Sequence, residues 1–203
     1  MIVGTVTDAL SGEPVYKATI LVGGRTTLRY MDRNFQITNL TPGAHQLNVS
    51  APGYESEIRE INLKKGKNFV EISVKGKEIP NLHHIIVFAD SVNTRGIQIE
   101  IRFVNKQGIG IKHFPRVAMS MDAELFVRLG TKDNYRRGRL VYAGPVDLFW
   151  DPKASFGKNK GIIPKDRLKV GPELKGMFGI LDLVLHMEQG DFKETIRDIL
   201  LDF

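Results

Sequence analysis

Short runs that alternate between apolar and polar residues fill most of this chain, and turn signals separate them. Seven such runs lie within residues 1–76, spaced roughly eight to twelve residues apart. The turns between them are marked by segments such as Gly12-Glu13-Pro14-Val15 and Leu40-Thr41-Pro42-Gly43. Alternation with a period of two is typical of half-buried strands, so we expect an antiparallel β-sandwich in this region.

Several pieces follow one another in a characteristic order, namely Gly4-Thr5-Val6-Thr7-Asp8, Gly12-Glu13-Pro14-Val15, Ala18-Thr19-Ile20, Phe35, Leu40, Pro42-Gly43 and Ala51-Pro52-Gly53-Tyr54. This order resembles the carboxypeptidase regulatory-like domain, a transthyretin-like β-sandwich, over roughly the first 75 residues. One departure is Met31-Asp32-Arg33-Asn34, which stands where family members carry a Gly-rich acidic turn.

The resemblance implies a non-catalytic module that packs, spaces or binds. An enzymatic relative of transthyretin hydrolyses a urate derivative with His and Arg residues and ends in Tyr-Arg-Gly-Ser. This chain ends in Leu200-Leu201-Asp202-Phe203 and has no His in its first predicted strand, so we do not expect that activity.

A polar segment with Gly and Pro, residues 75–80, predicts a boundary between one domain at 1–76 and a second at 81–203. The second domain also alternates, most clearly where Ile97, Ile99 and Ile101 are separated by polar residues. No helix is required before residue 190. We therefore predict an all-β protein of two tandem sandwiches, the second of immunoglobulin-like type without its usual cysteines.

The last segment, residues 191–203, fits two structures. Phe192, Ile196, Ile199, Leu200 and Phe203 follow one another at spacings of four, three, one and three, which fits one face of a helix. Gln189-Gly190-Asp191 can equally form the turn of a hairpin whose last residues are an edge strand.

Composition narrows the classes of protein to consider. The 203 residues include no cysteine, which excludes a disulfide framework and a thiolate zinc site. No apolar run approaches the ~20 residues of a membrane-spanning helix, and no secretory signal precedes Ile2. The chain as it stands is expected to be cytoplasmic, or surface-exposed if it is a fragment of a longer protein.

The net charge of +6 is unevenly distributed. Residues 153–175 carry seven cations and two acids, a balance of +5, whereas residues 182–203 carry six acids and two cations, a balance of −4. Such an arrangement is compatible with internal neutralisation and with a docking surface.

Cations and an aromatic residue also mark the best binding candidates. A loop of about twenty residues, predicted at 151–172, is longer than most connections in compact domains, and long loops are often functional. The candidate binding residues are Arg136, Arg137, Arg139, Trp150, Lys158, Lys160, Lys165, Arg167 and Lys169.

Catalytic and metal candidates are weaker. His83, His84, Asp90 and His113 have side chains that bind metals, but adjacent strand residues point to opposite faces, so we expect no metal there. Asp122 and Glu124 are expected on the solvated face of a strand. Phosphate-binding loops and the Gly-x-Ser-x-Gly turn are absent from the sequence.

We therefore predict a non-enzymatic interaction or structural accessory protein without a cofactor, whose loops bind another protein or a surface polymer. The alternatives are a nucleic-acid-binding protein that uses the basic residues above, and a hydrolase that uses the His and Asp residues at 83, 84, 90 and 113.

Overall fold

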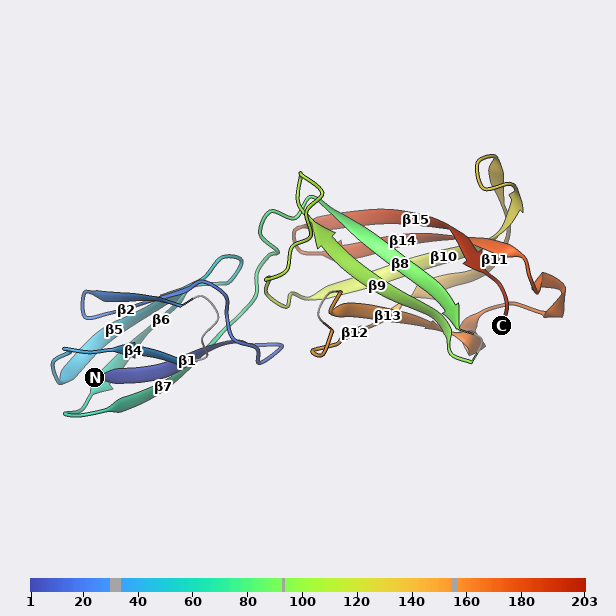
Figure 1. Cartoon of the computed structure of the whole chain (residues 1–203). Helices are drawn as coiled ribbons and strands as arrows, with labels where there is room; N and C mark the ends of the chain where they lie inside the picture. Colours follow the sequence, from blue (N-terminus) through green and yellow to red (C-terminus); the bar gives the residue numbers. More distant parts are fainter. Residues whose placement is uncertain (30–33, 93, 155–156) are drawn as a thin grey trace. The chain divides into compact units, whose positions relative to one another are not determined.

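The computed structural model of the chain describes residues 1–29, 34–92, 94–154 and 157–203, and almost all of its regular structure is β-strand (Figure 1). The prediction of an all-β protein is confirmed. Contacts divide the chain into an N-terminal unit, Met1–Pro80 with His113–Val117, and a C-terminal unit, Asn81–Lys112 with Ala118–Phe203. Within the described ranges, no helix has the length and apolar character needed to cross a membrane.

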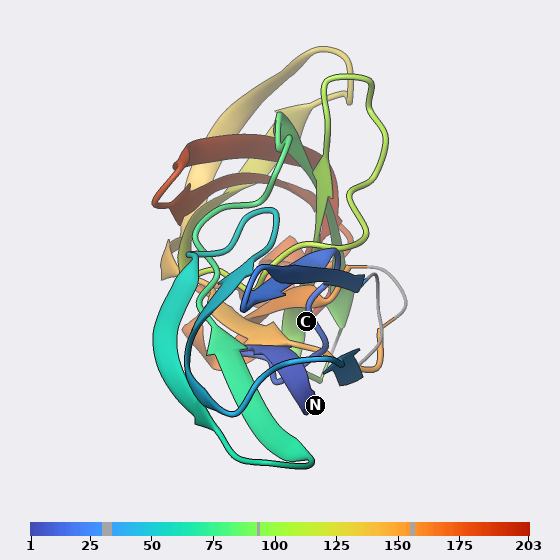
Figure 2. The same cartoon turned by 90° about the vertical axis from the view of Figure 1, so that its left-hand side faces the viewer.

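The N-terminal unit is a sandwich of two sheets, whose strands are coloured from blue to teal in Figure 2. One sheet has the order β4-β1-β7, with β1 antiparallel to β4 and parallel to β7, and the other has the order β3-β2-β5-β6. The strands are β1 Ile2–Asp8, β2 Ala18–Val22, β3 Arg25–Arg29, β4 Asn34–Ile37, β5 Gly43–Ser50, β6 Glu57–Leu63 and β7 Asn68–Val74.

Alternation along these strands builds the core between the two sheets. On β2, Ala18, Ile20 and Val22 are buried, and on the neighbouring strand β5 of the same sheet Leu47 and Val49 are buried beside them. The open side of the sandwich is bridged by Arg59 of β6, whose Nη2 donates to the carbonyl oxygen of Glu71 on β7 at 2.7 Å. An inward-pointing charge of this kind discourages pairing with another chain at a sheet edge.

The C-terminal unit is a second sandwich of two four-stranded sheets, as far as the described residues show, with orders β8-β9-β13-β12 and β11-β10-β14-β15. In the notation used for immunoglobulin domains these orders are A-B-E-D and C′-C-F-G, so the immunoglobulin-like prediction is confirmed. The elements are β8 His84–Val92, β9 Gly96–Val104, β10 Met119–Gly130, β11 Tyr135–Pro145, β12 Asp147–Trp150, β13 Asn159–Pro164, β14 Phe178–Met187 and β15 Gly190–Leu200, with short 3₁₀ turns η1 Lys165–Arg167 and η2 Pro172–Leu174.

Two predictions made from the sequence are corrected by these elements. The loop predicted at 151–172 is wrong, because its middle is β13, which pairs with both β12 and β9. For the last segment the helix is wrong and the hairpin is confirmed, because β15 pairs along β14 and forms an edge of its sheet. Residues 31–33, part of the departure from the family pattern, lie outside the described residues.

Candidate binding surface of the C-terminal unit

The predicted binding residues lie on several elements rather than on one loop. β11 carries three of them and β13 one, while the rest lie at the end of β12, before β13, on η1 and just after η1. In that order they are Arg136, Arg137 and Arg139; Lys160; Trp150; Lys158; Lys165 and Arg167; and Lys169. Four of these cations, Arg137, Arg139, Lys160 and Arg167, lie against acidic partners, which changes what they can bind.

Arg137 forms the most complete of these ion pairs. Its Nε and Nη2 donate to the two carboxylate oxygens of Asp182 on β14 at 2.7 and 2.9 Å. The hydroxyl of Thr195 on β15 donates to the same carboxylate at 2.7 Å. The hydrogen bond from Arg137 is the main reason that the pKa of Asp182 lies below its ordinary value. This group links three strands and holds Arg137 in a bidentate pair.

Lys160 and Lys158 are also engaged within the unit. Lys160 of β13 and Arg102 of β9 both donate to the Glu100 carboxylate. Burial acts to raise the pKa of Glu100, but the hydrogen bonds from Lys160 and Arg102 outweigh it and hold that pKa below its ordinary value. Lys158 lies over the ring of Trp150, with Nζ 5.4 Å from the centroid. Two predicted cations and the predicted aromatic residue therefore stabilise the sheet β8-β9-β13-β12.

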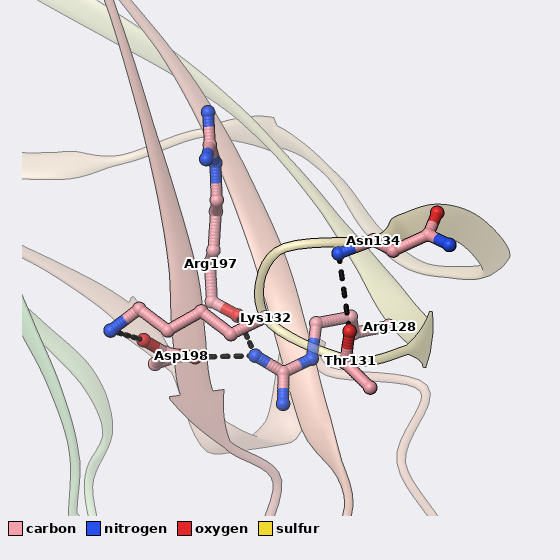
Figure 3. A network of polar contacts seen from close by, with 6 residues as sticks. All are labelled: Arg128, Thr131, Lys132, Asn134, Arg197 and Asp198. Carbon is pink, nitrogen blue, oxygen red and sulfur yellow. Dashed lines mark hydrogen bonds and ion pairs between the residues drawn. The ribbon is translucent and has the colours of Figure 1, made fainter.

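Arg128, which the sequence analysis did not single out, forms a further network at the tip of the β10–β11 hairpin (Figure 3). Arg128 and Lys132 both form ion pairs with Asp198 of β15, and Arg128 Nη1 also donates to the carbonyl oxygen of Arg197 at 3.0 Å. The Arg128 guanidinium lies 4.8 Å from the ring centroid of Phe178. Because these partners come from three strands, spacing along the sequence gave no signal for them.

Arg139 and Arg167 are paired more openly. Arg139 contacts Glu173 at 2.9 Å, and Arg167 Nη1 contacts Asp147 at 2.9 Å. All four side chains are about half exposed, so each pair contributes little to stability and each guanidinium keeps donors that face solvent. The hydrogen bond with Asp147 is the main cause that raises the pKa of Arg167.

A hollow of about 660 Å³ lies where β11 leads into β12. Residues 140–145 of β11 line it together with Asp147, Arg167 and Lys169. The backbone N–H of Lys169 donates to the carbonyl oxygen of Val141 at 2.8 Å, and the Tyr142 hydroxyl donates to that of Pro145 at 2.5 Å. The hollow therefore combines a shielded strand edge with two cations, and its size is that of ordinary ligand pockets.

The candidate metal ligands are not gathered into one site. The rings of His83 and His84 meet edge to face at 5.6 Å, and the ring of His113 stacks on Tyr16 at 4.5 Å within the N-terminal unit. Asp90 is exposed on β8. Across the described residues, no three His, Asp or Glu side chains are placed to hold a metal ion.

Asp122 and Glu124 lie exposed on β10, on the face opposite the buried Met121 and Ala123, as the alternation predicts. Asp122 contacts His186 of β14, whose Nε2 lies 3.4 Å from the carboxylate, and His186 Nδ1 lies 2.9 Å from Asp191 of β15. Sequence analysis missed this cross-strand group because its members come from three strands.

Comparison with known proteins gives one family. The family model of the carboxypeptidase regulatory-like domain matches residues 1–75. A search of curated proteins gives no match. The sheet orders of the N-terminal unit extend over this same segment.

Solved structures give distant likenesses. A proposed carbohydrate-binding protein of Bacteroides uniformis is 11% identical, with 97% of each chain covered and a TM-score of 0.34. Latent PorU of Porphyromonas gingivalis is 15% identical over 98% of this chain, which spans 17% of PorU, with a TM-score of 0.33. The major pilin subunit BcpA of Bacillus cereus is 12% identical over 99% of this chain and 68% of its own, also with a TM-score of 0.33. Likenesses at this level carry no conclusion about function. The comparisons therefore show one family resemblance, which is the match of residues 1–75 to the model of the carboxypeptidase regulatory-like domain.

Proposed function

We propose that this chain is a non-catalytic binding protein, and that the hollow beside β11 contacts an acidic group of a partner protein or surface polymer. The observation that carries the proposal is that Arg167 and Lys169 both line that hollow, where Arg167 keeps donors facing solvent beside its partner Asp147. Cations beside a partly apolar concave surface favour anionic groups, because the surrounding protein strengthens their field. The division into domains at 1–76 and 81–203 belongs to the same proposal.

The ionisable groups support a structural role more than a catalytic one. Asp182 and Asp198 have pKa values held below their ordinary range, in each case mainly by a hydrogen bond from a basic side chain. Such shifts favour the charged form that an ion pair uses, whereas a catalytic acid needs its pKa raised toward neutrality.

The alternative of nucleic-acid binding is weakened by the same pairs. A nucleic-acid surface needs cations that are free to replace the counterions of the phosphate backbone. Arg137 and Lys160 are already paired with the less exposed carboxylates of Asp182 and Glu100, so using them would break existing contacts.

Affinity capture from an extract of the source organism tests the proposal. The baits are the wild-type chain, Lys169→Gln, Arg167→Gln/Lys169→Gln and a control, Lys64→Gln/Lys65→Gln, which removes two exposed cations of the N-terminal unit. Lys169→Gln leaves the ion pair between Arg167 and Asp147 in place, so its effect reports on binding rather than on lost pairing.

We expect a defined partner whose capture survives nuclease treatment and is unchanged with the control bait. With each variant in the hollow the affinity for this partner should fall about tenfold, which corresponds to about 1.4 kcal/mol. Equal capture by all baits would contradict the proposed surface. Capture lost to nuclease, with a steep dependence on salt, would favour nucleic acid instead.

A further inference from the structure

A short segment far along the chain packs as part of the N-terminal unit. His113–Val117 lies in the connection between β9 and β10, yet its contacts assign it to the same unit as Met1–Pro80. Pro115 and Val117 are buried. We call residues His113–Val117 the strap.

The carboxylate of Asp8 holds the strap. Asp8 ends β1 and is only 3% exposed. One of its oxygens accepts the N–H groups of Leu10 and Ser11 at 2.9 and 2.8 Å, which closes the turn after β1. The other oxygen accepts the backbone N–H of Arg116 at 2.9 Å. A buried carboxylate is costly unless its oxygens are bonded, so the strap stabilises Asp8 as much as Asp8 holds the strap.

Tyr54 belongs to the surroundings of Asp8. Burial, and then the charge and hydrogen bond of Asp8, raise the pKa of Tyr54 far above its ordinary value. This shift favours the protonated phenol, which can donate to Asp8. Donors from the turn, from Tyr54 and from the strap converge on this one carboxylate.

Other contacts fix the path of the strap along the unit. The ring of His113 stacks on Tyr16, and Nη1 of Arg116 donates to the carbonyl oxygen of Leu10 at 3.2 Å. Next to β7, a Cβ atom built on Gly76 would lie 2.6 Å from the carbonyl oxygen of Arg116 and 2.8 Å from Cβ of Pro115. Any side chain at position 76 would therefore push the strap away.

We propose that Asp8 and Gly76 form a built-in receptor for the strap, and that docking of His113–Val117 completes the fold of the N-terminal unit. The sequence motif that ends in Asp8 thus has a second task besides closing its own turn. One oxygen of Asp8 serves the turn and the other serves the strap. The turn can therefore persist when the strap is released, so docking and turn formation are separable.

Backbone hydrogen exchange on the full chain separates these two tasks. Gly76→Ala adds one methyl group against the strap and leaves Asp8 unchanged. Gly110→Ala is the matched control, because a Cβ there meets nothing within 4 Å. We expect the Arg116 amide to exchange at least tenfold faster in Gly76→Ala, with Leu10 and Ser11 unchanged. In Asp8→Ala all three amides are expected to exchange faster, because all three lose their acceptor.

Two outcomes would overturn the proposal. The first is an Arg116 amide that exchanges in Gly76→Ala as slowly as in the wild-type chain. The second needs no variant: an Arg116 amide that exchanges in the wild-type chain at the rate of an unfolded peptide means that the strap is not docked. Slow exchange of the Arg116 amide in the wild-type chain and in Gly110→Ala, together with its faster exchange in Gly76→Ala, is the result that supports the proposal.

Discussion

His186 lies on the outer face of the sheet β11-β10-β14-β15, between carboxylates from the strands on either side of it. On β15 its register partner is Asp191, and on β10 Asp122 is within reach, while Lys193 follows two residues after Asp191. The hydrogen bond with Asp191 is the main cause that raises the pKa of His186, and the charge of Asp122 adds to it.

The first prediction concerns the titration of His186. A histidine whose pKa is raised by folding stabilises the fold below its unfolded pKa of about 6.5, and this stabilisation is lost as pH rises through the folded pKa. We therefore expect an NMR titration of its ring to give a midpoint above about 6.5. Asp191→Asn should lower the midpoint more than Asp122→Asn does.

A His186 midpoint at or below that of an unperturbed histidine, or one that Asp191→Asn leaves unchanged, would show that the cross-strand contact does not form in solution.

Single residues also show where sequence analysis ends. The residue types of the binding candidates could be identified, and Arg167 and Lys169 do lie together at one hollow. The ion pairs of the C-terminal unit could not be predicted. Asp182 lies 45 residues after its partner Arg137, and Asp198 lies 70 residues after Arg128, so only the folded sheet brings each pair together.

At the scale of elements, the sequence of β13 shows why we expected a loop where the structure has a strand. Its residues alternate in burial, with Asn159, Gly161 and Ile163 inward, but the inward set contains an amide and a glycine and gives no apolar pattern. Only the neighbouring strands β12 and β9 make it a strand. Pairing partners distant in sequence override local signals in such cases.

Gly161 gives a second prediction. A Cβ there would lie 2.6 Å from Cγ1 of Val146, a buried side chain, and 3.1 Å from Cδ2 of Leu148. Gly161→Ala should therefore lower the free energy of unfolding by about 1–3 kcal/mol, the usual cost of overpacking. Urea denaturation measures it, with Gly110→Ala expected within about 0.5 kcal/mol of the wild-type chain. Equal stability of the two variants would contradict the packing described around β13.

The hairpin of β14 and β15 shows a second reason why secondary structure could not be predicted from the sequence alone. Phe192 and Ile196, both half-buried, pair with Leu185 and Leu181, and the buried Ile199 follows a register shift between Gly179 and Leu181. Phe192 and Ile196 keep the alternation of a strand at a spacing of four, and the bulge then gives a spacing of three, so that the set imitates one face of a helix. The sequence alone therefore supported both structures equally.

A third prediction concerns the tip of the β10–β11 hairpin, which is also closed by the Thr131 hydroxyl accepting the N–H of Asn134 at 3.1 Å (Figure 3). The hydrogen bond from Lys132, and then that from Arg128, hold the pKa of Asp198 below its ordinary value. Asp198→Asn should lower the melting temperature and speed amide exchange at 130–135, because the Arg128 side chain, only 11% exposed, loses its charged partner.

Asp133→Asn is the control for this prediction, since it removes an exposed acid from the same tip and is expected to leave both readouts near those of the wild-type chain. Identical exchange in the two variants would mean that Asp198 does not anchor the hairpin.

For the whole molecule, the uneven charge is largely neutralised inside the C-terminal unit. The acidic strands β14 and β15 pair mainly with the hairpin of β10 and β11, through Asp182 and Asp198, while Lys175 approaches Asp202 at 3.9 Å. From the basic segment that follows β13, the exposed Arg167 and Lys169 line the hollow. We therefore place partner binding at the hollow beside β11 in the C-terminal unit.

The architecture was more predictable than the site. In residues 1–75 the turn residues and the alternation agree at every strand that the structure describes, and the family match covers the same segment. In the C-terminal unit the apolar alternation of β9 and β10 predicted strands, but the order of the strands followed from pairing across the sheets.

The most direct test of the binding account is an NMR titration of the full chain with poly-L-glutamate as a model acidic partner. We predict saturable shifts of the backbone amides of Ala143, Gly144, Arg167 and Lys169, which weaken as salt is added and disappear in Lys169→Gln. Shifts that centre on the β10–β11 hairpin tip instead, or none at concentrations that saturate other cationic surfaces, would contradict it.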